Sequence, residues 1–378
     1  MHAVRVTGHS GGSAEAPDSG DDALRRLGWD DRLAALATGA ARDTTRPGRV
    51  ARVDRGLSTV ITAVDTERAA LSVDLRDAGP IERPAVGDWV LVDDQEGEVI
   101  VVAVLPRTSA FVRGAMREDE TTGAQVVAAN VDTVFIVQSL TAGPRLRRLE
   151  RELVLAWESG AAPVVVLSKA DLLDEAQLAD VRDSVETVAL GVPVHFVSNV
   201  TGEGADELRE YASGNRTVAL IGASGVGKST LVNRLVGADV QETAEVREKD
   251  QRGRHTTVAR ELVLLPGGGV LVDTPGLRAL ALWESDDGLS RAFPDVEALL
   301  GDCRFTDCAH ETEPGCAVLA AVERGEITAE RLESYRGLVR ELERQEEASD
   351  PRARAERNRQ ERNFHRMIKA TMRDNPKR

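Results

Sequence analysis

The sequence predicts a multidomain protein with a small N-terminal β-barrel of the OB type, a central α/β domain and a C-terminal helical domain. Five short strand-like segments come first, and alternating strands and helices follow them. A glycine-rich loop interrupts the second region, and all the cysteines lie in the third. We place the barrel at 46–113, the α/β domain at 127–284 and the helical domain at 285–348, with a flexible extension at 1–45 and a basic tail at 349–378.

The barrel is predicted from five short apolar segments that turn residues separate. Such a series is typical of a small closed barrel. Barrels of this type often bind RNA, although many only bridge proteins, so the pattern leaves both roles open. The segments are Gly48–Val53, Leu57–Val64, Ala70–Leu75, Asp88–Val92 and Glu98–Leu105, and a short helix is expected before them at Asp31–Leu36.

The central domain begins with the apolar run Asn130–Val137. Buried-strand runs and helical spacing alternate from there to about Leu282. This alternation predicts a mostly parallel sheet with helices on both faces.

A phosphate-binding loop is predicted where Gly222–Ser229 reads G-A-S-G-V-G-K-S, between a buried strand and a helix. Its glycines let the backbone turn its N–H groups towards phosphates, and the helix that follows adds its positive end. Lys228 is expected to reach the β- and γ-phosphates, and the Ser229 hydroxyl to bind Mg²⁺. The expected contact residues are Gly222, Ala223, Ser224, Gly225, Val226, Gly227, Lys228, Ser229 and Thr230.

Two further motifs follow apolar strands. The sequence D-T-P-G begins at Asp273, whose carboxylate is suited to holding Mg²⁺ through water, and the N–H of Gly276 is placed to sense a γ-phosphate. The sequence S-K-A-D ends at Asp171, and one carboxylate can accept both adjacent donors of guanine. Lys169 is expected to lie along the base. Taken alone, each tetrapeptide could be a plain turn.

Together these motifs resemble the phosphate, switch and guanine-reading elements of a GTPase. In an ordinary GTPase the guanine reader comes last, whereas here it precedes the phosphate loop, so the chain is expected to be circularly permuted. That element usually begins with Asn. The Ser168 hydroxyl is shorter than an asparagine side chain and cannot make both of the hydrogen bonds that the amide would make, so we expect a lower guanine affinity. Ser198, which ends a later strand, is expected near the base with the backbone of Asn199.

The segment Gly253–Thr257 lies where the first switch belongs. Thr256 and Thr257 are both candidates to complete the Mg²⁺ shell and report the γ-phosphate. His255 is a candidate to position water, although a lone loop histidine is commonly just solvated. Leu277 stands where many GTPases carry a water-orienting glutamine, so slow intrinsic hydrolysis is expected.

The three cysteines fall within one short segment with His310, in the pattern C-x4-C-x-H-x5-C. An odd, clustered set argues against disulfides. Three thiolates and one imidazole are typical of a closed, tetrahedral structural Zn²⁺ site. The predicted ligands are Cys303, Cys308, His310 and Cys316, whereas Asp302 and Asp307 are weaker candidates.

The net charge of −15 argues against a generic nucleic-acid binder, but the charge is unevenly distributed. Residues 351–378 carry +7, which leaves −22 on the other 350 residues. Such a tail suggests RNA or phosphate contact, although a solvated helix explains it equally well. With neither a long apolar run nor a signal peptide, we expect a cytoplasmic protein that does not contact membranes.

The barrel, the permuted motifs and the cysteine pattern together resemble the ribosome small subunit-dependent GTPase A family (RsgA, also YjeQ) over roughly residues 27–348. The resemblance implies a late-acting assembly factor of the bacterial small ribosomal subunit. Such a factor would bind near the decoding region through its barrel and its zinc domain, and the subunit would stimulate its hydrolysis of GTP. By motif match, Lys169 and Asp171 would read guanine, and Thr257 and Asp273 would serve the Mg²⁺.

Two other functions are compatible with parts of the sequence. A P-loop ATPase or small-molecule kinase would share the phosphate loop, but Asp171 favours guanine. A non-enzymatic RNA-binding scaffold would not need the intact Lys228, Ser229 and Asp273. We therefore expect a GTPase that binds GTP, GDP and small-subunit rRNA and that acts as a monomer.

Overall fold

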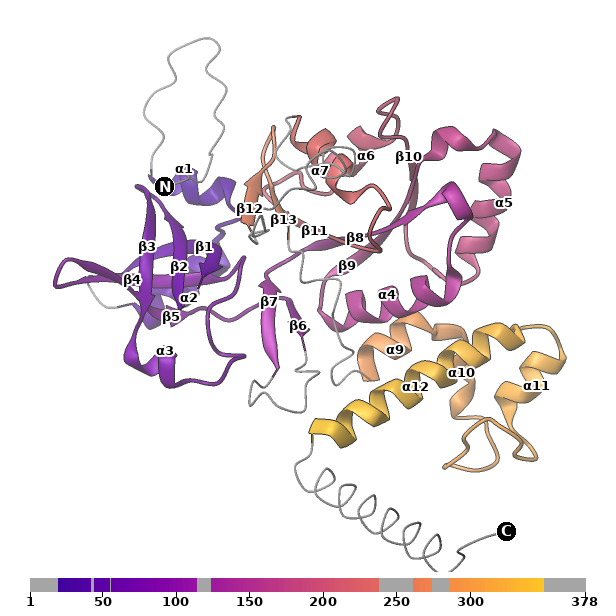
Figure 1. Ribbon diagram of the computed structural model, residues 1–378. Coiled ribbons are helices and arrows are strands. Elements are labelled where there is room, and N and C mark those ends of the chain that lie inside the picture. The colour runs from indigo at the N-terminus through magenta and orange to yellow at the C-terminus, as the bar shows by residue number, and fades with distance from the viewer. Residues whose placement is uncertain are drawn as a thin grey trace, which may run out of the picture.

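The structure is a computed structural model that describes residues 20–41, 44–54, 56–113, 124–237, 261–273 and 286–349. The β-barrel, the α/β domain and the C-terminal helices follow one another in space as they do along the chain (Figure 1). The predicted first switch, residues 253–257 with His255, Thr256 and Thr257, lies outside the described residues, and so do Gly276 and Leu277. The basic tail from residue 350 onward lies outside them too.

The N-terminal barrel closes in the strand order β1-β2-β3-β5-β4, in which β3 and β5 run parallel and the other pairs antiparallel. Val50, Val60 and Val101 point into its interior and are fully buried. The closed five-stranded barrel confirms the predicted OB type. Its strands are β1 (Arg46–Asp54), β2 (Leu57–Thr62), β3 (Thr66–Leu71), β4 (Trp89–Gln95) and β5 (Glu98–Val104).

The third predicted strand, Ala70–Leu75, was wrong in its second half. Strand β3 ends at Leu71, and a short helix, α3 (Val73–Asp77), begins two residues later. The Ser72 hydroxyl caps that helix by accepting a hydrogen bond from the Leu75 N–H at 3.3 Å. A serine at the N-cap therefore turns the chain, although the apolar residues around it also fit a strand.

Two helices precede the barrel, α1 (Gly20–Arg26) and α2 (Asp31–Ala40). Asp30 caps α2 through the Leu33 N–H at 2.7 Å. Leu27 and Leu33 are buried, and the Trp29 ring meets Trp89 of β4 edge-on at 4.9 Å. The described part of the N-terminal segment is therefore packed against the barrel.

The α/β domain holds a six-stranded sheet in the order β10-β9-β8-β11-β13-β12, parallel except for the edge strand β12. This confirms the mostly parallel sheet. In this order β11 lies between the three strands that precede it in the chain and the two that follow it. The strands are β8 (Thr133–Ser139), β9 (Ala162–Ser168), β10 (Val194–Val197), β11 (Thr217–Ile221), β12 (Glu261–Leu264) and β13 (Val270–Asp273).

Helices cover both faces of this sheet (Figure 1). Leu149 of α4 packs on the face that carries Ile136 and Val165, and Leu231 of α7 on the face that carries Phe135. The sheet is therefore buried on both sides, which explains its continuous apolar strands. The helices are α4 (Leu146–Glu158), α5 (Glu175–Glu186), α6 (Ala205–Glu210) and α7 (Lys228–Val236), and the short β6 (Ala110–Arg113) and β7 (Gln125–Ala129) form a separate pair.

The C-terminal domain packs against α4 with α9 (Asp286–Ala292) and α12 (Ala329–Ser349). Arg331 of α12 is buried and donates to Glu150 of α4 at 2.8 Å and to Asp295 at 2.8 Å. A second ion pair joins Arg151 to Glu341 at 2.8 Å. These ion pairs fix the domain to the α/β domain through one helix, and α10 (Pro294–Leu300) and α11 (Ala317–Glu323) complete it.

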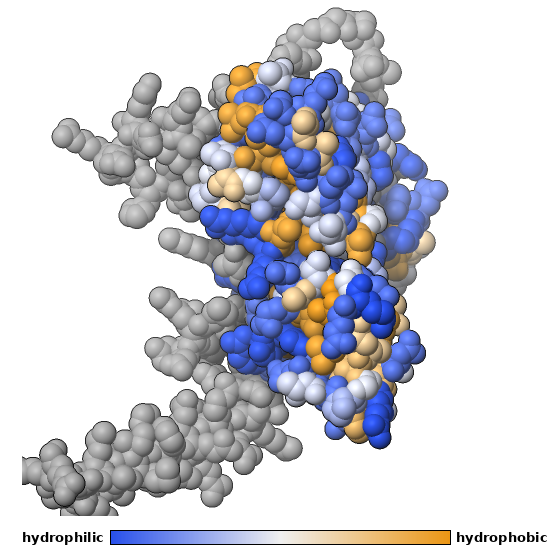
Figure 2. Space-filling view, turned by 90° about the vertical axis from the view of Figure 1, so that its right-hand side faces the viewer, coloured by the Kyte–Doolittle hydropathy of each residue, from blue (hydrophilic) through white to orange (hydrophobic). Residues whose placement is uncertain are grey.

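Figure 2 shows the side of the molecule formed by the α/β domain and the C-terminal helices. Hydrophilic residues cover much of this side, with hydrophobic residues interspersed. Phe305, which belongs to the cysteine-rich loop, is 40% exposed. Scattered apolar side chains of this kind are normal on a protein surface. Among the described residues, no helix is long and apolar enough to span a bilayer.

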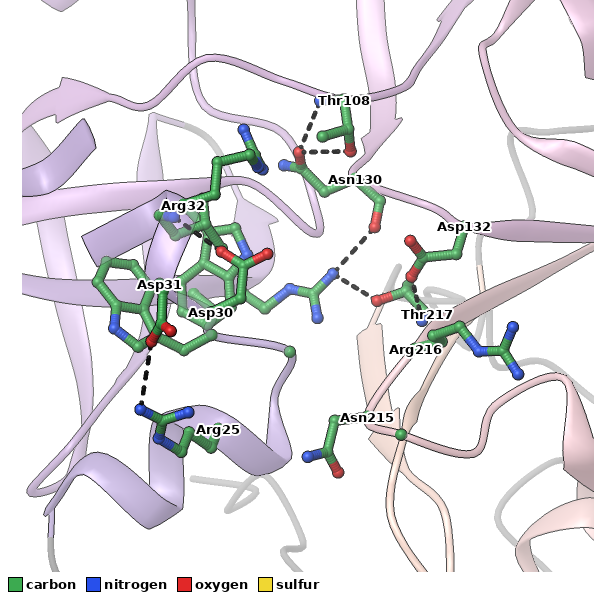
Figure 3. Close-up of a pocket in the computed structure, with 16 residues that line it drawn as sticks. Arg25, Asp30, Asp31, Arg32, Thr108, Asn130, Asp132, Asn215, Arg216 and Thr217 are labelled. Atoms are coloured by element: carbon green, nitrogen blue, oxygen red, sulfur yellow. Dashed lines mark hydrogen bonds and ion pairs between the residues drawn. The ribbon is translucent and has the colours of Figure 1, made fainter. Parts of the chain in front are cut away.

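A buried arginine joins the barrel to the α/β domain. Arg49 of β1 is 1% exposed and donates to the Thr217 hydroxyl at 2.8 Å, to the carbonyls of Asn130 and Gly87 at 3.2 Å, and to the Leu27 carbonyl. Burial lowers the pKa of its guanidinium to about 10, so it stays charged at neutral pH. It lies beside a cavity of about 410 Å³ at the junction of the two domains (Figure 3).

We expect Arg49→Met to lower the free energy of unfolding by about 3–5 kcal/mol, because the buried acceptors around it lose their donor. Arg52→Met is the matched control, since Arg52 lies on the same strand but is half-buried, with 31% of its side chain exposed, and pairs with Asp54. That control should cost no more than about 1 kcal/mol. Denaturant unfolding measures both, and equal losses in the two variants would contradict the role of Arg49.

Candidate functional site

The predicted nucleotide motifs meet at one edge of the sheet. The phosphate loop follows β11, S-K-A-D follows β9 and Ser198 follows β10. Strand β13, which ends at Asp273, lies directly beside β11. Because parallel strands end at the same edge, the sheet brings together elements that the sequence presents in permuted order.

The phosphate loop joins β11 to α7 through two glycines in backbone conformations that other residues rarely adopt. Gly222 has φ 139°, and a Cβ there would lie 2.3 Å from the Val137 carbonyl oxygen. Gly227 has φ 94° and immediately precedes the first residue of α7, Lys228. The helix therefore begins where the motif predicts, with its positive end at the loop.

Lys228 folds over its own loop. Its ammonium donates to the carbonyl of Gly222 at 2.9 Å and to that of Ala223. This places one positive charge within the loop, beside the backbone N–H groups that precede α7. A phosphate bound there would find a cation and a helix N-terminus together, which is the arrangement that anion sites of this type use.

The base-reading loop is held by Asp171 and Ser198. The Ser198 hydroxyl donates to Asp171 Oδ1 at 2.6 Å and accepts from the N–H of Thr201 at 3.1 Å. The structure thus brings together two of the residues that the motifs single out. Asp171 is exposed, and a carboxylate in such a position can accept the two adjacent donors of guanine.

Lys169 adopts the left-handed region with φ 64°, at the start of the short helical turn η2 (Ala170–Leu172). Its ammonium donates to the Thr141 hydroxyl at 3.1 Å. Thr141 belongs to η1 (Leu140–Ala142), which follows β8. Thr141 was not singled out from the sequence, because nothing in its neighbourhood forms a recognisable motif.

Ser168 is fully buried and joins the base-reading loop to the phosphate loop. Its hydroxyl lies 2.6 Å from the Val226 carbonyl oxygen and 3.2 Å from that of Gln138. The Gln138 side chain in turn donates to Glu152 of α4 at 3.2 Å and accepts from the Arg145 N–H at 2.8 Å. A polar connection therefore runs from the phosphate loop to α4, the helix that carries the C-terminal domain.

The switch residues are only partly described. Asp273 is the last residue of β13, as the sequence predicts, and it pairs with Glu261 of β12. Thr257, His255 and Gly276 lie outside the described residues, so their roles remain predictions.

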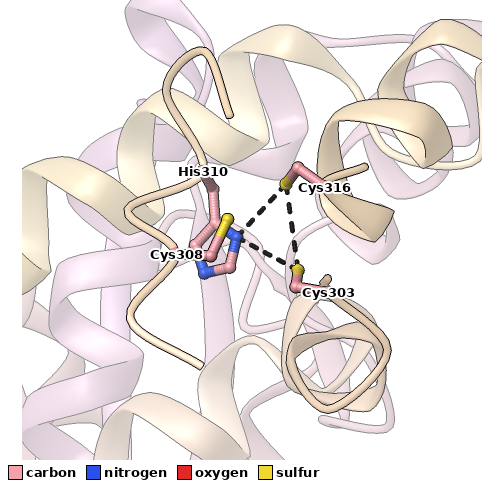
Figure 4. A group of neighbouring side chains, drawn as sticks. All are labelled: Cys303, Cys308, His310 and Cys316. Carbon is pink, nitrogen blue, oxygen red and sulfur yellow. Dashed lines mark hydrogen bonds between the residues drawn. The ribbon is translucent and has the colours of Figure 1, made fainter. Parts of the chain in front are cut away.

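The cysteine pattern forms a compact cluster in the C-terminal domain (Figure 4). Its four ligand atoms, from Cys303, Cys308, His310 and Cys316, all lie within 4.8 Å of one another. Cys303 Sγ lies 3.9 Å from Cys316 Sγ and 3.6 Å from His310 Nδ1, and His310 Nδ1 lies 3.4 Å from Cys316 Sγ. Tetrahedral Zn–S and Zn–N bonds imply edges of roughly 3.5–3.8 Å. The three separations among Cys303, His310 and Cys316 lie close to these edges, and Cys308 completes the set of four ligands that such a site needs.

One carboxylate shapes the loop that carries Cys308 and His310. Glu313 accepts hydrogen bonds from the N–H groups of Ala309 at 3.1 Å, Glu311 at 2.8 Å and Thr312 at 3.0 Å. Backbone donors, beginning with its own N–H, lower the pKa of the Glu313 carboxyl to about 2. The loop is thus ordered by a group that the cysteine pattern does not include.

Comparison with known proteins agrees with this geometry. A family model described as RsgA GTPase matches residues 104–283. The Streptomyces coelicolor protein named small ribosomal subunit biogenesis GTPase RsgA is 47% identical over 339 residues, which cover 89% of this chain and 92% of that protein. A protein of the same name from Methanosarcina acetivorans is 43% identical, covering 83% of this chain and 84% of that protein.

Solved structures show the same architecture. YjeQ from Thermotoga maritima has a TM-score of 0.60 and 29% identity, covering 79% of this chain and 98% of that one. YloQ, described as a circularly permuted GTPase, has a TM-score of 0.56 and 23% identity, covering 81% and 99% respectively, and so supports the fold. With relatives this similar over most of its length, the chain belongs to the RsgA family of GTPases.

Proposed function

We propose that this chain is a GTPase that binds the small ribosomal subunit and acts late in its assembly, hydrolysing GTP to GDP and phosphate. The observation that carries the proposal is the meeting of the guanine-reading and phosphate loops at one sheet edge in permuted order. The curated relatives named above are small ribosomal subunit biogenesis GTPases, which supports the subunit as partner. We propose that the chain works in the cytoplasm as a monomer.

In this proposal the phosphates of GTP lie along Gly222–Thr230, and Asp171, Lys169 and Ser198 receive the base. The Ser229 and Thr257 hydroxyls and the Asp273 carboxylate serve Mg²⁺, which neutralises the charge of the β- and γ-phosphates. The N–H of Gly276 senses the γ-phosphate.

The cysteine cluster is proposed to hold one structural Zn²⁺ ion. Four protein ligands leave no open position on the metal, so it orders the segment and takes no part in hydrolysis. The ordered segment then presents a fixed surface beside α12, and we propose that this surface and the barrel together contact rRNA.

Slow intrinsic hydrolysis is expected because Leu277 cannot orient water. We propose that the subunit orders the switches and that His255 positions the attacking water. The Ser168–Gln138–Glu152 connection offers a route from the nucleotide to α4, and so to the C-terminal domain that α4 carries. Normal stimulation of a His255→Ala variant would remove only the role of the histidine.

Co-sedimentation with purified small subunits tests the proposal. With a non-hydrolysable GTP analogue, the protein should pellet with the subunits, and binding should weaken as salt rises, because rRNA contacts release counterions. With GDP, less protein should pellet. Large subunits are the control. Equal pelleting with large and small subunits, or none with either, would contradict the proposed partner.

A further inference from the structure

The side chain of Ser168 can bond only one carbonyl of the phosphate loop, that of Val226. The Ser168 hydroxyl has one proton, and the carbonyl oxygens of both Val226 and Gln138 lie within its reach. The next loop carbonyl, that of Gly227, is not contacted by Ser168. That carbonyl accepts from the Leu231 N–H of α7 at 2.9 Å, and its second lone pair can accept from one further donor.

Asn199 supplies that donor from a different loop. It lies on the loop after β10, and its Nδ2 donates to the Gly227 carbonyl oxygen at 3.2 Å. A Cβ on Gly227 would lie 3.1 Å from Asn199 Nδ2 and 3.8 Å from Ser168 Oγ. The two side chains thus lie on the same side of Gly227, where each bonds one of two successive carbonyls.

The backbone of this loop is fixed to α7 as well. Arg234 of α7 donates to the Asn199 carbonyl at 3.1 Å. Asn199 Oδ1 is buried and has no hydrogen-bond partner among the described residues, so the hydrogen bond from Nδ2 to Gly227 orients the amide. An acidic side chain at this position would turn an oxygen towards the Gly227 carbonyl oxygen.

We propose that Asn199 is a positioning residue of the nucleotide site, and that its amide replaces the one that the serine at 168 lacks. This inference rests on the proposed GTPase function. The bond fixes the Val226–Gly227 turn, and with it the N–H groups that face the phosphates. Because the bond joins two parts of the protein at the start of α7, we expect it to affect the binding of GDP and GTP alike.

Titration with fluorescent GDP and with a GTP analogue tests the inference on the full-length protein. Asn199→Ala should weaken both affinities by about 5–10-fold, the equivalent of one hydrogen bond, and Asn199→Asp should weaken them further. Subunit-stimulated kcat should change less than twofold. Val200→Ala is the matched control, because the neighbouring Val200 side chain is 80% exposed and should leave affinity unchanged.

A double-mutant cycle tests the replacement itself. In a Ser168→Asn background, the amide at 168 should bond the phosphate loop in place of the Asn199 amide. Asn199→Ala should then weaken nucleotide affinity by less than twofold. If Ser168→Asn does not fold, comparison of Asn199→Asp with Val200→Asp decides instead, because both variants add a negative charge to this loop and only the first also removes the donor to the Gly227 carbonyl. Equal losses of affinity in the two variants would overturn the inference.

The outcomes separate this inference from the proposed function. Wild-type protein that binds no guanine nucleotide would overturn the proposed function. If the wild type binds nucleotide and Asn199→Ala binds it equally well, the inference alone is overturned. The same holds if Asn199→Ala loses as much affinity in the Ser168→Asn background as in the wild type. A lower unfolding midpoint without nucleotide, at unchanged affinity, would assign Asn199 a structural role only and overturn it too.

Discussion

Cys308→Ser should release the bound metal and unfold the segment that holds the cysteine cluster. Zinc contributes on the order of 10 kcal/mol to the folding of small zinc-finger peptides, and a hydroxyl is a poor replacement for a thiolate. The rest of the C-terminal domain should stay attached, because Arg331 fixes α12 to Glu150 of α4 independently of the cluster. Nucleotide binding by the α/β domain should therefore largely persist.

Metal analysis of purified protein and hydrogen exchange over residues 300–320 measure this effect. Asp307→Ala is the matched control, since Asp307 is an exposed carboxylate beside Cys308 that does not belong to the cluster. The control should keep one zinc per chain. A full zinc complement in Cys308→Ser would refute the assignment of Cys308 as a ligand.

Asp171→Asn should move the preference of the protein from GTP towards XTP. Xanthine carries a carbonyl where guanine carries an amino group, and an amide offers one donor and one acceptor in place of two acceptors. With GTP, one hydrogen bond to a charged group is lost, the other is weakened because its acceptor is now neutral, and two donors face each other, which corresponds to about 10²–10³-fold in affinity. The Ser198 hydroxyl, which donates to Asp171 Oδ1, can donate equally to the amide oxygen.

Competition binding with GTP and XTP measures the preference directly. Asp180→Asn is the control, because Asp180 is an exposed acid of α5 away from the base-reading loop. It should leave the ratio of the two affinities as in the wild type. An Asp171→Asn variant that still preferred GTP by the wild-type margin would show that Asp171 does not read the base.

Motifs and hydrophobic periodicity predicted the architecture well, because they depend on short stretches of sequence. The closed barrel, the mostly parallel sheet and a helix directly after the phosphate loop were predicted in this way and are confirmed. The error at Ala70–Leu75 has the same origin. A short apolar run fits both strand and helix, and only the capping bond from Leu75 to Ser72 decides between them.

The polar contacts between domains could not be predicted, because their partners are far apart in the sequence. Arg49 and Arg331 look like surface arginines in the sequence, yet both are buried and bond residues of other elements. Asn199 follows a predicted motif residue, but its partner Gly227 lies on another loop. The unusual serine at 168 was the one signal that a compensating residue was needed.

The rate of GTP hydrolysis with and without purified small ribosomal subunits tests the central claim most directly. The isolated protein should turn over slowly, because Leu277 cannot orient water. Added small subunits at low salt with Mg²⁺ should raise the rate by a large factor, up to the roughly 10³–10⁵-fold that activating partners provide for other GTPases. Large subunits should have little effect. A turnover rate that small subunits leave unchanged would contradict a ribosome-activated GTPase.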